Sequence, residues 1–170
     1  ATAGKIGYEN EINAIAREVA EFSGYSQAMT YSFESKKVYD KLMIGASDPI
    51  RNAIEISNPL GEDFSIMRTV SLNGMMTSLA TNYNRRNAEC ALYEMGNIYL
   101  AKSLPLTELP DERMQLTLGS YNYGDFFDLK GVVEELLQRV GMDDHVSYDP
   151  KSEKTFLHTG RQADILYDGE

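Results

Sequence analysis

The sequence predicts an α+β fold in which an antiparallel sheet is flanked by helices. Helical and strand-like stretches are mixed along the chain without the regular strand–helix–strand alternation that is typical of a parallel sheet. Two strand-like segments, 91–100 and 114–121, are separated by a loop that contains Pro105 and Pro110, as expected for antiparallel neighbours. The chain has 170 residues, which is enough to form one domain with a buried core.

Three helices are predicted from apolar residues that recur at steps of three and four. They cover 9–22, 72–84 and the stretch up to Val140 that follows Asp125 and Asp128. The two aspartates stand directly before the apolar stripe, and this spacing favours an N-terminal cap over a metal site. The remaining predicted elements are a strand at 28–33, a short helix at 35–42, and strands at 54–56, 146–148 and 163–167.

The charge balance and the cysteine content limit the partners and the compartment. The chain carries 16 Lys and Arg against 26 Asp and Glu, a net charge of −10, which excludes a generic basic surface for nucleic acid. Any contact with RNA must therefore be local. Cys90 is the only cysteine, so an intramolecular disulfide is excluded and a reducing, cytoplasmic location is expected. No segment approaches the roughly 20 apolar residues of a membrane span, so no membrane partner is expected.

Residues with catalytic potential do not form a known constellation. His145 and His158 have no second Cys or His at the spacing of metal ligands. The glycines do not form the loops that hold nucleotide phosphates in P-loop or dinucleotide-binding folds. We therefore expect no catalytic residue, no cofactor-binding residue and no metal ligand in this domain.

Three arginines are candidates for binding an anion. Arg85 and Arg86 follow the predicted helix 72–84, and their guanidinium groups suit a phosphate or a carboxylate. Solvated charges at a helix end are the favoured alternative for this pair. Arg161 follows Gly160, and a turn into the next strand explains this glycine equally well.

Several motifs occur in a fixed order along the chain. Residues 58–87 contain an Asn-Pro-Leu turn, an acidic pair, an Arg-Thr segment and a helix that ends in Asn-Tyr-Asn-Arg. They are followed by Leu-Tyr-Glu-Met-Gly at 92–96, Asp-Phe-Phe-Asp-Leu-Lys-Gly at 125–131 and His-Thr-Gly-Arg at 158–161. In this order the motifs resemble the core module of bacterial phenylalanyl-tRNA synthetase β subunits. Thr159 stands where the family usually has proline.

The resemblance implies a class II aminoacyl-tRNA synthetase-like core, within an enzyme that charges tRNA(Phe) with phenylalanine at the expense of ATP. In that family the α subunit carries out the reaction, and the β core resembles a catalytic module that has lost its site. Two departures support this loss: Arg68 is followed by Thr69-Val70 instead of an Arg-x-Glu arrangement, and Gly160-Arg161 lacks repeated glycines. ATP and magnesium are therefore expected for the holoenzyme and not for this domain. Residues 1–170 are expected to be one inactive core domain, truncated at its C-terminal end.

The resemblance also implies the partners. They are the α subunit, tRNA(Phe) through the holoenzyme, and an (αβ)2 heterotetramer in which the helix at 9–22 contributes to subunit association. The candidates for contact with tRNA or another subunit are Arg68, Arg85, Arg86 and Arg161. The expected function is a non-catalytic assembly core; the alternative is a small-ligand binding module with the same fold.

Overall fold

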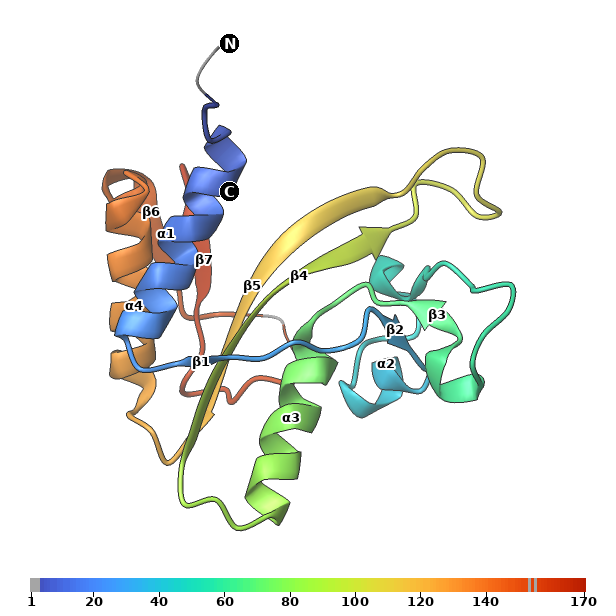
Figure 1. Ribbon diagram of the computed structural model, residues 1–170, viewed down its shortest axis with the longest axis horizontal. Helices are drawn as coiled ribbons and strands as arrows, with labels where there is room; N and C mark the ends of the chain where they lie inside the picture. The colour runs from blue at the N-terminus through green and yellow to red at the C-terminus, as the bar shows by residue number, and fades with distance from the viewer. Residues whose placement is uncertain (1–3, 153, 155) are drawn as a thin grey trace. The chain divides into compact units, whose positions relative to one another are not determined.

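Two long antiparallel strands, β4 (Cys90–Leu100) and β5 (Asp111–Tyr121), form the largest paired element of the structure (Figure 1). Each strand has eleven residues, and the register runs without a break from one end of the pair to the other. Both predicted strands are confirmed, and the second begins at Asp111 instead of Met114. Two further strand pairs, β2 with β3 and β6 with β7, are also antiparallel, so the antiparallel pairing expected for the fold class is confirmed.

The computed structural model describes residues 4–152, 154 and 156–170, and the chain divides into two compact units. The first unit contains the described residues up to 26 and from 122 onward, and the second contains residues 27–121. The expectation of a single domain over the whole chain stays a prediction.

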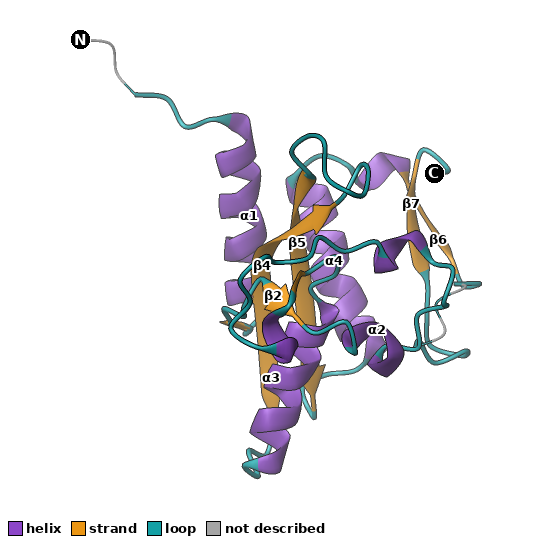
Figure 2. Ribbon diagram, turned by 90° about the vertical axis from the view of Figure 1, so that its right-hand side faces the viewer, coloured by secondary structure: helices purple, strands orange, loops and turns teal. Residues whose placement is uncertain are grey.

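Helix α3 (Leu72–Asn84) packs along β4 and β5 within the second unit, as Figures 1 and 2 show. Its buried residues include Met75 and Leu79, whose spacing is part of the pattern that predicts this helix. Gly119 of β5 lies against them, because a Cβ at that position would stand 2.8 Å from both Leu79 Cδ1 and Met75 Cγ. The missing side chain therefore lets the helix approach the strand closely.

The second unit also contains a region of short elements that precedes α3. These elements are β2 (Phe33–Glu34), α2 (Val38–Lys41), the 3-10 turns Pro49–Arg51 and Glu62–Phe64, and β3 (Ile66–Met67). Their apolar side chains form a common core made of Val38, Tyr39, Leu42, Ile44, Ala53 and Ile66. This small core holds the segment before α3 in place through hydrophobic burial, since the strands themselves are too short to do so.

Two strands predicted in this region differ from the structure. The strand expected at 28–33 is wrong for most of its length, because strand conformation is limited to β1 (Ser26–Gln27) and to β2. The N–H of Thr30 donates to the Oε1 atom of Glu94 at 3.0 Å and not to a neighbouring backbone. The strand expected at 54–56 is reduced to one bridge between residues 55 and 66.

The first unit is built on two packed helices, α1 (Tyr8–Phe22) and α4 (Phe126–Arg139). α1 ends where Gly24 adopts a φ of 85°, and the N–H of Tyr25 donates to the carbonyl of Ala20 at 3.0 Å. This is the Schellman arrangement, for which glycine is favoured because its φ is positive. The helix predicted at 9–22 is confirmed.

The N-terminal cap of α4 is also confirmed. The Asp125 carboxylate accepts hydrogen bonds from the N–H groups of Phe127 and Asp128, at 2.7 and 3.2 Å. The Asp128 carboxylate accepts in turn from the N–H of Asp125 at 2.7 Å, which completes a capping box. The two aspartates therefore satisfy backbone donors at the start of the helix.

Replacing Asp125 with alanine is expected to destabilise the chain by about 1 kcal/mol, because two N–H groups lose their acceptor. The change is measured as a shift of the urea midpoint followed by circular dichroism. Asp125→Asn is the control, and it should retain most of the stability because asparagine caps helices about as well. Equal losses in the two variants would show that the cap is not the source of the effect.

Three short elements complete the first unit: the 3-10 turn Asp143–His145, β6 (Val146–Asp149) and β7 (Asp164–Tyr167). Reciprocal hydrogen bonds between the backbones of Tyr167 and Glu170, at 2.9 and 3.1 Å, form a tight turn after β7. Asp168 and Gly169 between them have φ values of 52° and 88°. Aspartate and glycine tolerate this left-handed conformation better than most residues.

Candidate functional site

A buried polar cluster in the second unit is centred on Arg68, which follows β3. The Arg68 side chain is 3% exposed, and its Nη1 atom lies 3.1 Å from the Oε1 atom of Glu94 on β4, whose side chain is 4% exposed. Nη1 also donates to the Thr30 hydroxyl at 3.1 Å, and Nε donates to the carbonyl of Asn97 at 2.7 Å. The Thr30 hydroxyl donates to the Glu94 carboxylate at 2.9 Å. The two buried charges are thus paired and hydrogen-bonded, as burial requires.

Gly96 gives the Arg68 guanidinium its space. A Cβ at residue 96 would stand 1.9 Å from Arg68 Nη2 and 3.3 Å from Glu94 Oε1. Two residues of the Leu-Tyr-Glu-Met-Gly motif therefore accommodate the Arg68 guanidinium, since Glu94 carries the opposite charge and Gly96 has no side chain to clash with it. The motif therefore has a structural role at this position, and its Tyr93 is fully buried beside the buried Glu94.

The residues after Arg68 are also used inside the unit. The Thr69 hydroxyl donates to the carbonyl of Ile50 at 2.7 Å and lies 3.0 Å from the Tyr39 hydroxyl. Burial raises the pKa of Tyr39 above its ordinary value, so this hydroxyl stays protonated and can donate to Thr69. Ser71 donates to the side-chain oxygen of Gln115 on β5 at 3.0 Å. The Arg-Thr segment consequently joins β3, the 3-10 turn at 49–51 and the long strand pair.

The four arginines that the sequence singles out do not form one site. Arg68 is buried, and its Nε and Nη1 atoms already bind Glu94, Thr30 and Asn97, which argues against the expected contact with tRNA or another subunit. Arg85 and Arg86 are exposed at the end of α3, where Arg86 has a φ of 62°. Arg161 is exposed in the first unit, so these arginines are divided between the two units. The candidate contact role of the three exposed arginines stays a prediction.

Arg161 lies in a turn that its own motif builds. The N–H of Gly160 donates to His158 Nδ1 at 3.0 Å, and the N–H of Arg161 donates to the His158 carbonyl at 2.9 Å. The motif thus places the guanidinium on an exposed turn before β7. Across the described part of the chain, the guanidinium groups of Arg85, Arg86 and Arg161 have no hydrogen bond or ion pair.

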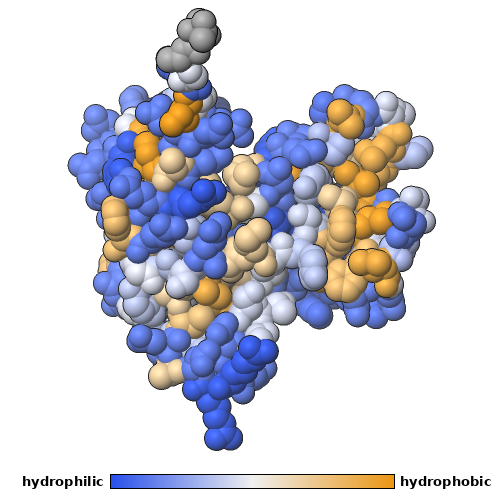
Figure 3. Space-filling model, in the orientation of Figure 1, coloured by the Kyte–Doolittle hydropathy of each residue, from blue (hydrophilic) through white to orange (hydrophobic). Residues whose placement is uncertain are grey.

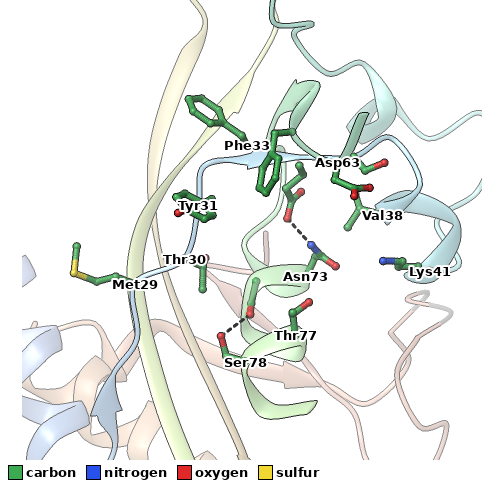
Figure 4. A pocket seen from close by; sticks show the side chains of 14 residues that line it. Met29, Thr30, Tyr31, Phe33, Val38, Lys41, Asp63, Asn73, Thr77 and Ser78 are labelled. Atoms are coloured by element: carbon green, nitrogen blue, oxygen red, sulfur yellow. Dashed lines mark hydrogen bonds between the residues drawn. The ribbon is translucent and has the colours of Figure 1, made fainter. Parts of the chain in front are cut away.

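A cavity of about 690 Å³ lies between the segment 29–35, α2 and α3 in the second unit (Figure 4). Glu34 lines it, is 5% exposed, and accepts a hydrogen bond from Asn73 Nδ2 at 3.0 Å through its Oε1 atom. The Oε2 atom of the same carboxylate is buried and has no hydrogen-bond partner within the described residues. Burial raises the pKa of Glu34, and the nearby Glu94 carboxylate acts in the same direction.

Sequence reasoning missed Glu34, Asn73 and the pairing of Glu94 with Arg68. One signal was present for the pairing, because Glu94 is a charged residue within an apolar strand segment and such residues need a buried partner. The cavity had no such signal, since it depends on how a loop segment is placed beside a helix.

The Glu34→Gln variant is expected to be more stable than the wild-type chain near pH 7, and this difference in stability is expected to disappear in acid. The folded-state pKa of Glu34 is raised, so wild-type stability falls as the pH rises from the unfolded-state pKa through the folded-state pKa. Glutamine cannot ionise and does not show this fall, while its amide oxygen can still accept from Asn73. Urea midpoints of both proteins at about pH 7 and about pH 4 measure the effect. A stability difference that is the same at both pH values contradicts it.

No helix among the described residues is long and apolar enough to cross a membrane. They also contain no group of three or more His, Cys, Asp or Glu side chains that could hold a metal ion.

Comparison with known proteins identifies first the class and then the family. A solved structure of a pyrrolysyl-tRNA synthetase from Desulfitobacterium hafniense, PylSc, superposes with a TM-score of 0.69 and 15% identity, covering 94% of this chain and 53% of that one. The fold is therefore that of a class II aminoacyl-tRNA synthetase. The family described as "Phenylalanyl tRNA synthetase beta chain CLM domain" matches residues 1–170, and the chain belongs to this family.

Individual relatives agree with the family. The chain is 41% identical over 155 residues to the "Phenylalanine--tRNA ligase beta subunit" of Clostridium acetobutylicum, and 39% identical over 153 residues to that of Clostridium tetani. These matches cover 91% and 90% of the chain but 19% of each relative. The resemblance inferred from the ordered motifs is thereby confirmed.

Proposed function

We propose that this chain is a non-catalytic assembly core of the β subunit of a phenylalanine-tRNA ligase. One observation carries the proposal: Arg68, Glu94 and Gly96, which lie in the motifs shared with the family, are joined to one another inside the unit. A guanidinium that is buried against a carboxylate is not available to a nucleotide phosphate, because the Arg68 side chain is 3% exposed and its Nε and Nη1 atoms already have partners inside the unit. These motif residues therefore preserve a fold and not a reaction.

In this proposal the chemistry belongs to the partner chain. The α subunit binds phenylalanine, ATP and magnesium and charges tRNA(Phe), and two copies of each subunit form an (αβ)2 heterotetramer. The enzyme works in the cytoplasm. The acidic character of this chain, with a net charge of −10, suits a protein partner better than a nucleic-acid one.

Exposed apolar residues on α1 support a contact with another subunit. Tyr8 and Phe22, at the two ends of the helix, are 76% and 80% exposed. Large aromatic side chains are enriched in protein interfaces, and here one is exposed at each end of the helix. Arg85, Arg86 and Arg161 remain the candidates for a local contact with tRNA.

Co-expression tests the assembly role. The complete β chain and the α subunit are expected to elute together in size-exclusion chromatography, and the double substitution Tyr8→Glu with Phe22→Glu is expected to shift the equilibrium toward separate subunits. Leu109→Glu is the matched control, because Leu109 is 84% exposed but lies in the loop between β4 and β5. Independent elution of the unmodified chains contradicts the proposal, as does ATP–pyrophosphate exchange by the complete β chain without α.

The cavity beside α3 favours a second candidate, a small-ligand binding module with the same fold. Isothermal titration of phenylalanine and of ATP into the complete β chain separates the two functions. The assembly core is expected to give no heat of binding with either compound, whereas a saturable heat signal would favour the second candidate.

A further inference from the structure

The cavity beside α3 contains a buried carboxylate with unused hydrogen-bonding capacity. Glu34 is 5% exposed, and of its two carboxylate oxygens only Oε1 has a hydrogen-bond partner within the described residues, the Asn73 amide. An ionised carboxylate offers about four acceptor positions. Leaving them unused in a buried place is costly, and such groups in native proteins call for a partner that completes them.

The position of Glu34 makes completion from the cavity feasible. The residue itself lines the cavity, as does its partner Asn73, whose hydrogen bond is drawn as a dashed line in Figure 4. The torsion about the Cγ–Cδ bond of a glutamate is broad, so the carboxylate can turn partly and present an oxygen to the cavity. A donor that enters the cavity can therefore be accepted without a movement of the backbone of β2.

The other lining groups favour a donor that is positively charged and planar. Asp63 adds a second carboxylate to the lining, and Lys41 adds one ammonium group. Three aromatic rings also line the cavity, those of Tyr31, Phe33 and Phe64. The rings of Tyr31 and Phe64 pack edge to face, with their centroids 5.6 Å apart. Aromatic faces beside carboxylates are the surroundings that bind guanidinium groups well.

The rim of the cavity points to a protein as the source of this group. Met29 is 90% exposed, Tyr31 74% and Phe33 40%, and all three line the cavity. In the space-filling view hydrophobic surface is visible over α2, β2 and β3 (Figure 3). Protein interfaces combine an apolar surface of this kind with an arginine anchor in a pocket. We propose that this cavity receives an arginine side chain of a protein partner, which binds the Glu34 carboxylate.

The charges around Glu34 define how the site should respond to substitution. Arg68 and Lys41 favour its ionised form, and Glu94 opposes it. Arg68 is already paired with Glu94 inside the unit, so Lys41 is the cation that competes with an incoming guanidinium. Removing the charge of Lys41 should therefore strengthen the site, whereas removing the charge of Glu34 should weaken it.

The test follows the methyl resonance of Met29 in the complete β chain, labelled at methionine methyl groups and assigned with Met29→Leu. The probe is Nα-acetyl-arginine methylamide, and its uncharged analogue Nα-acetyl-citrulline methylamide is the control. The arginine probe is expected to shift the Met29 signal saturably. The citrulline probe is expected to bind at least about tenfold more weakly, because it lacks the charge that strengthens the hydrogen bonds.

Three variants add direction to the test. Glu34→Gln is expected to weaken the arginine probe about tenfold, and Lys41→Ala to strengthen it. Glu135→Gln, which removes an exposed carboxylate from α4 in the first unit, should leave the affinity unchanged. If Glu34→Gln does not fold, the affinities of the two probes for the unmodified chain still test whether the cavity binds a guanidinium group. No Met29 response, or equal affinity for both probes, overturns the proposal.

A second arm identifies the source of the cation. In the complex that the chain forms with its natural protein partners, the Met29 signal is expected to be shifted already and to ignore the added probe. A signal that still titrates in the complex overturns the assignment to a protein side chain and makes a free guanidinium or ammonium compound the ligand. The inference goes beyond the proposed function and does not require the partner to be the α subunit, so failure of the co-expression test leaves the first arm intact.

Discussion

Replacing Glu94 with alanine is expected to destabilise the second unit by about 3–5 kcal/mol, because it leaves the Arg68 guanidinium buried without a counter-charge. The two side chains are 3% and 4% exposed and their nearest charged atoms lie 3.1 Å apart, so water cannot take over the lost interaction. The Thr30 hydroxyl would also lose its acceptor. The loss is measured as the shift in the urea midpoint, followed by circular dichroism.

An exposed ion pair provides the control for this prediction. Glu108 binds Lys102 in the loop between β4 and β5, with side chains 57% and 52% exposed, and Glu108→Ala should cost no more than about 1 kcal/mol. The double substitution of Glu94→Leu with Arg68→Met should cost less than Glu94→Ala, because no unpaired charge remains. Similar losses in Glu94→Ala and Glu108→Ala would mean that burial does not determine the strength of the pair.

Replacing Gly96 with alanine is expected to cost about 3 kcal/mol, at the upper end of the usual effect of overpacking. The added methyl group would stand 1.9 Å from Arg68 Nη2, so the guanidinium must leave the position in which it binds Glu94. The two substitutions Gly96→Ala and Arg68→Met are therefore expected to be coupled. In a chain that carries Arg68→Met, the shorter and uncharged side chain should reduce the cost of Gly96→Ala by at least about half.

Gly131 is the matched control for this substitution. It lies within α4, and a Cβ there would have no atom within 4 Å. Gly131→Ala should therefore stabilise the chain by up to about 1 kcal/mol, since alanine loses less conformational entropy in a helix. If Gly96→Ala and Gly131→Ala both proved neutral, the close approach of the Arg68 guanidinium to β4 would be refuted.

The sequence predicted the long elements well because each carries its own local signal. α1 and α3 bury apolar residues at helical spacing, and the apolar stripe after Asp128 in α4 has the same spacing and is half-buried. α4 also begins at an aspartate cap that is readable from two residues. β4 and β5 pair in an unbroken register over their eleven residues, and within β5 the apolar residues Met114, Leu116 and Leu118 alternate with polar ones. The short strands before α3 were not predicted correctly, because a strand of two residues depends on distant pairing partners and leaves almost no local pattern in the sequence.

The candidate site was less predictable for the same reason. The motifs showed that Arg68 and Glu94 matter, but their spacing along the chain, 26 residues, says nothing about a contact between them. Arg68 as a possible tRNA contact was the natural interpretation of a basic residue in a motif. Its burial argues against that interpretation, because a side chain that is 3% exposed has almost no surface to offer.

By itself the sequence determined the family, the long helices, the long antiparallel strands and the cap at Asp125, since these features depend on residues that are neighbours in the chain. Only the tertiary structure decided that Arg68, Glu94 and Gly96 form one buried cluster, and that Glu34 lies unpaired beside a cavity. The physical reason is that a buried charge is stable only when folding brings it a partner, and that partner is chosen in space and not along the chain.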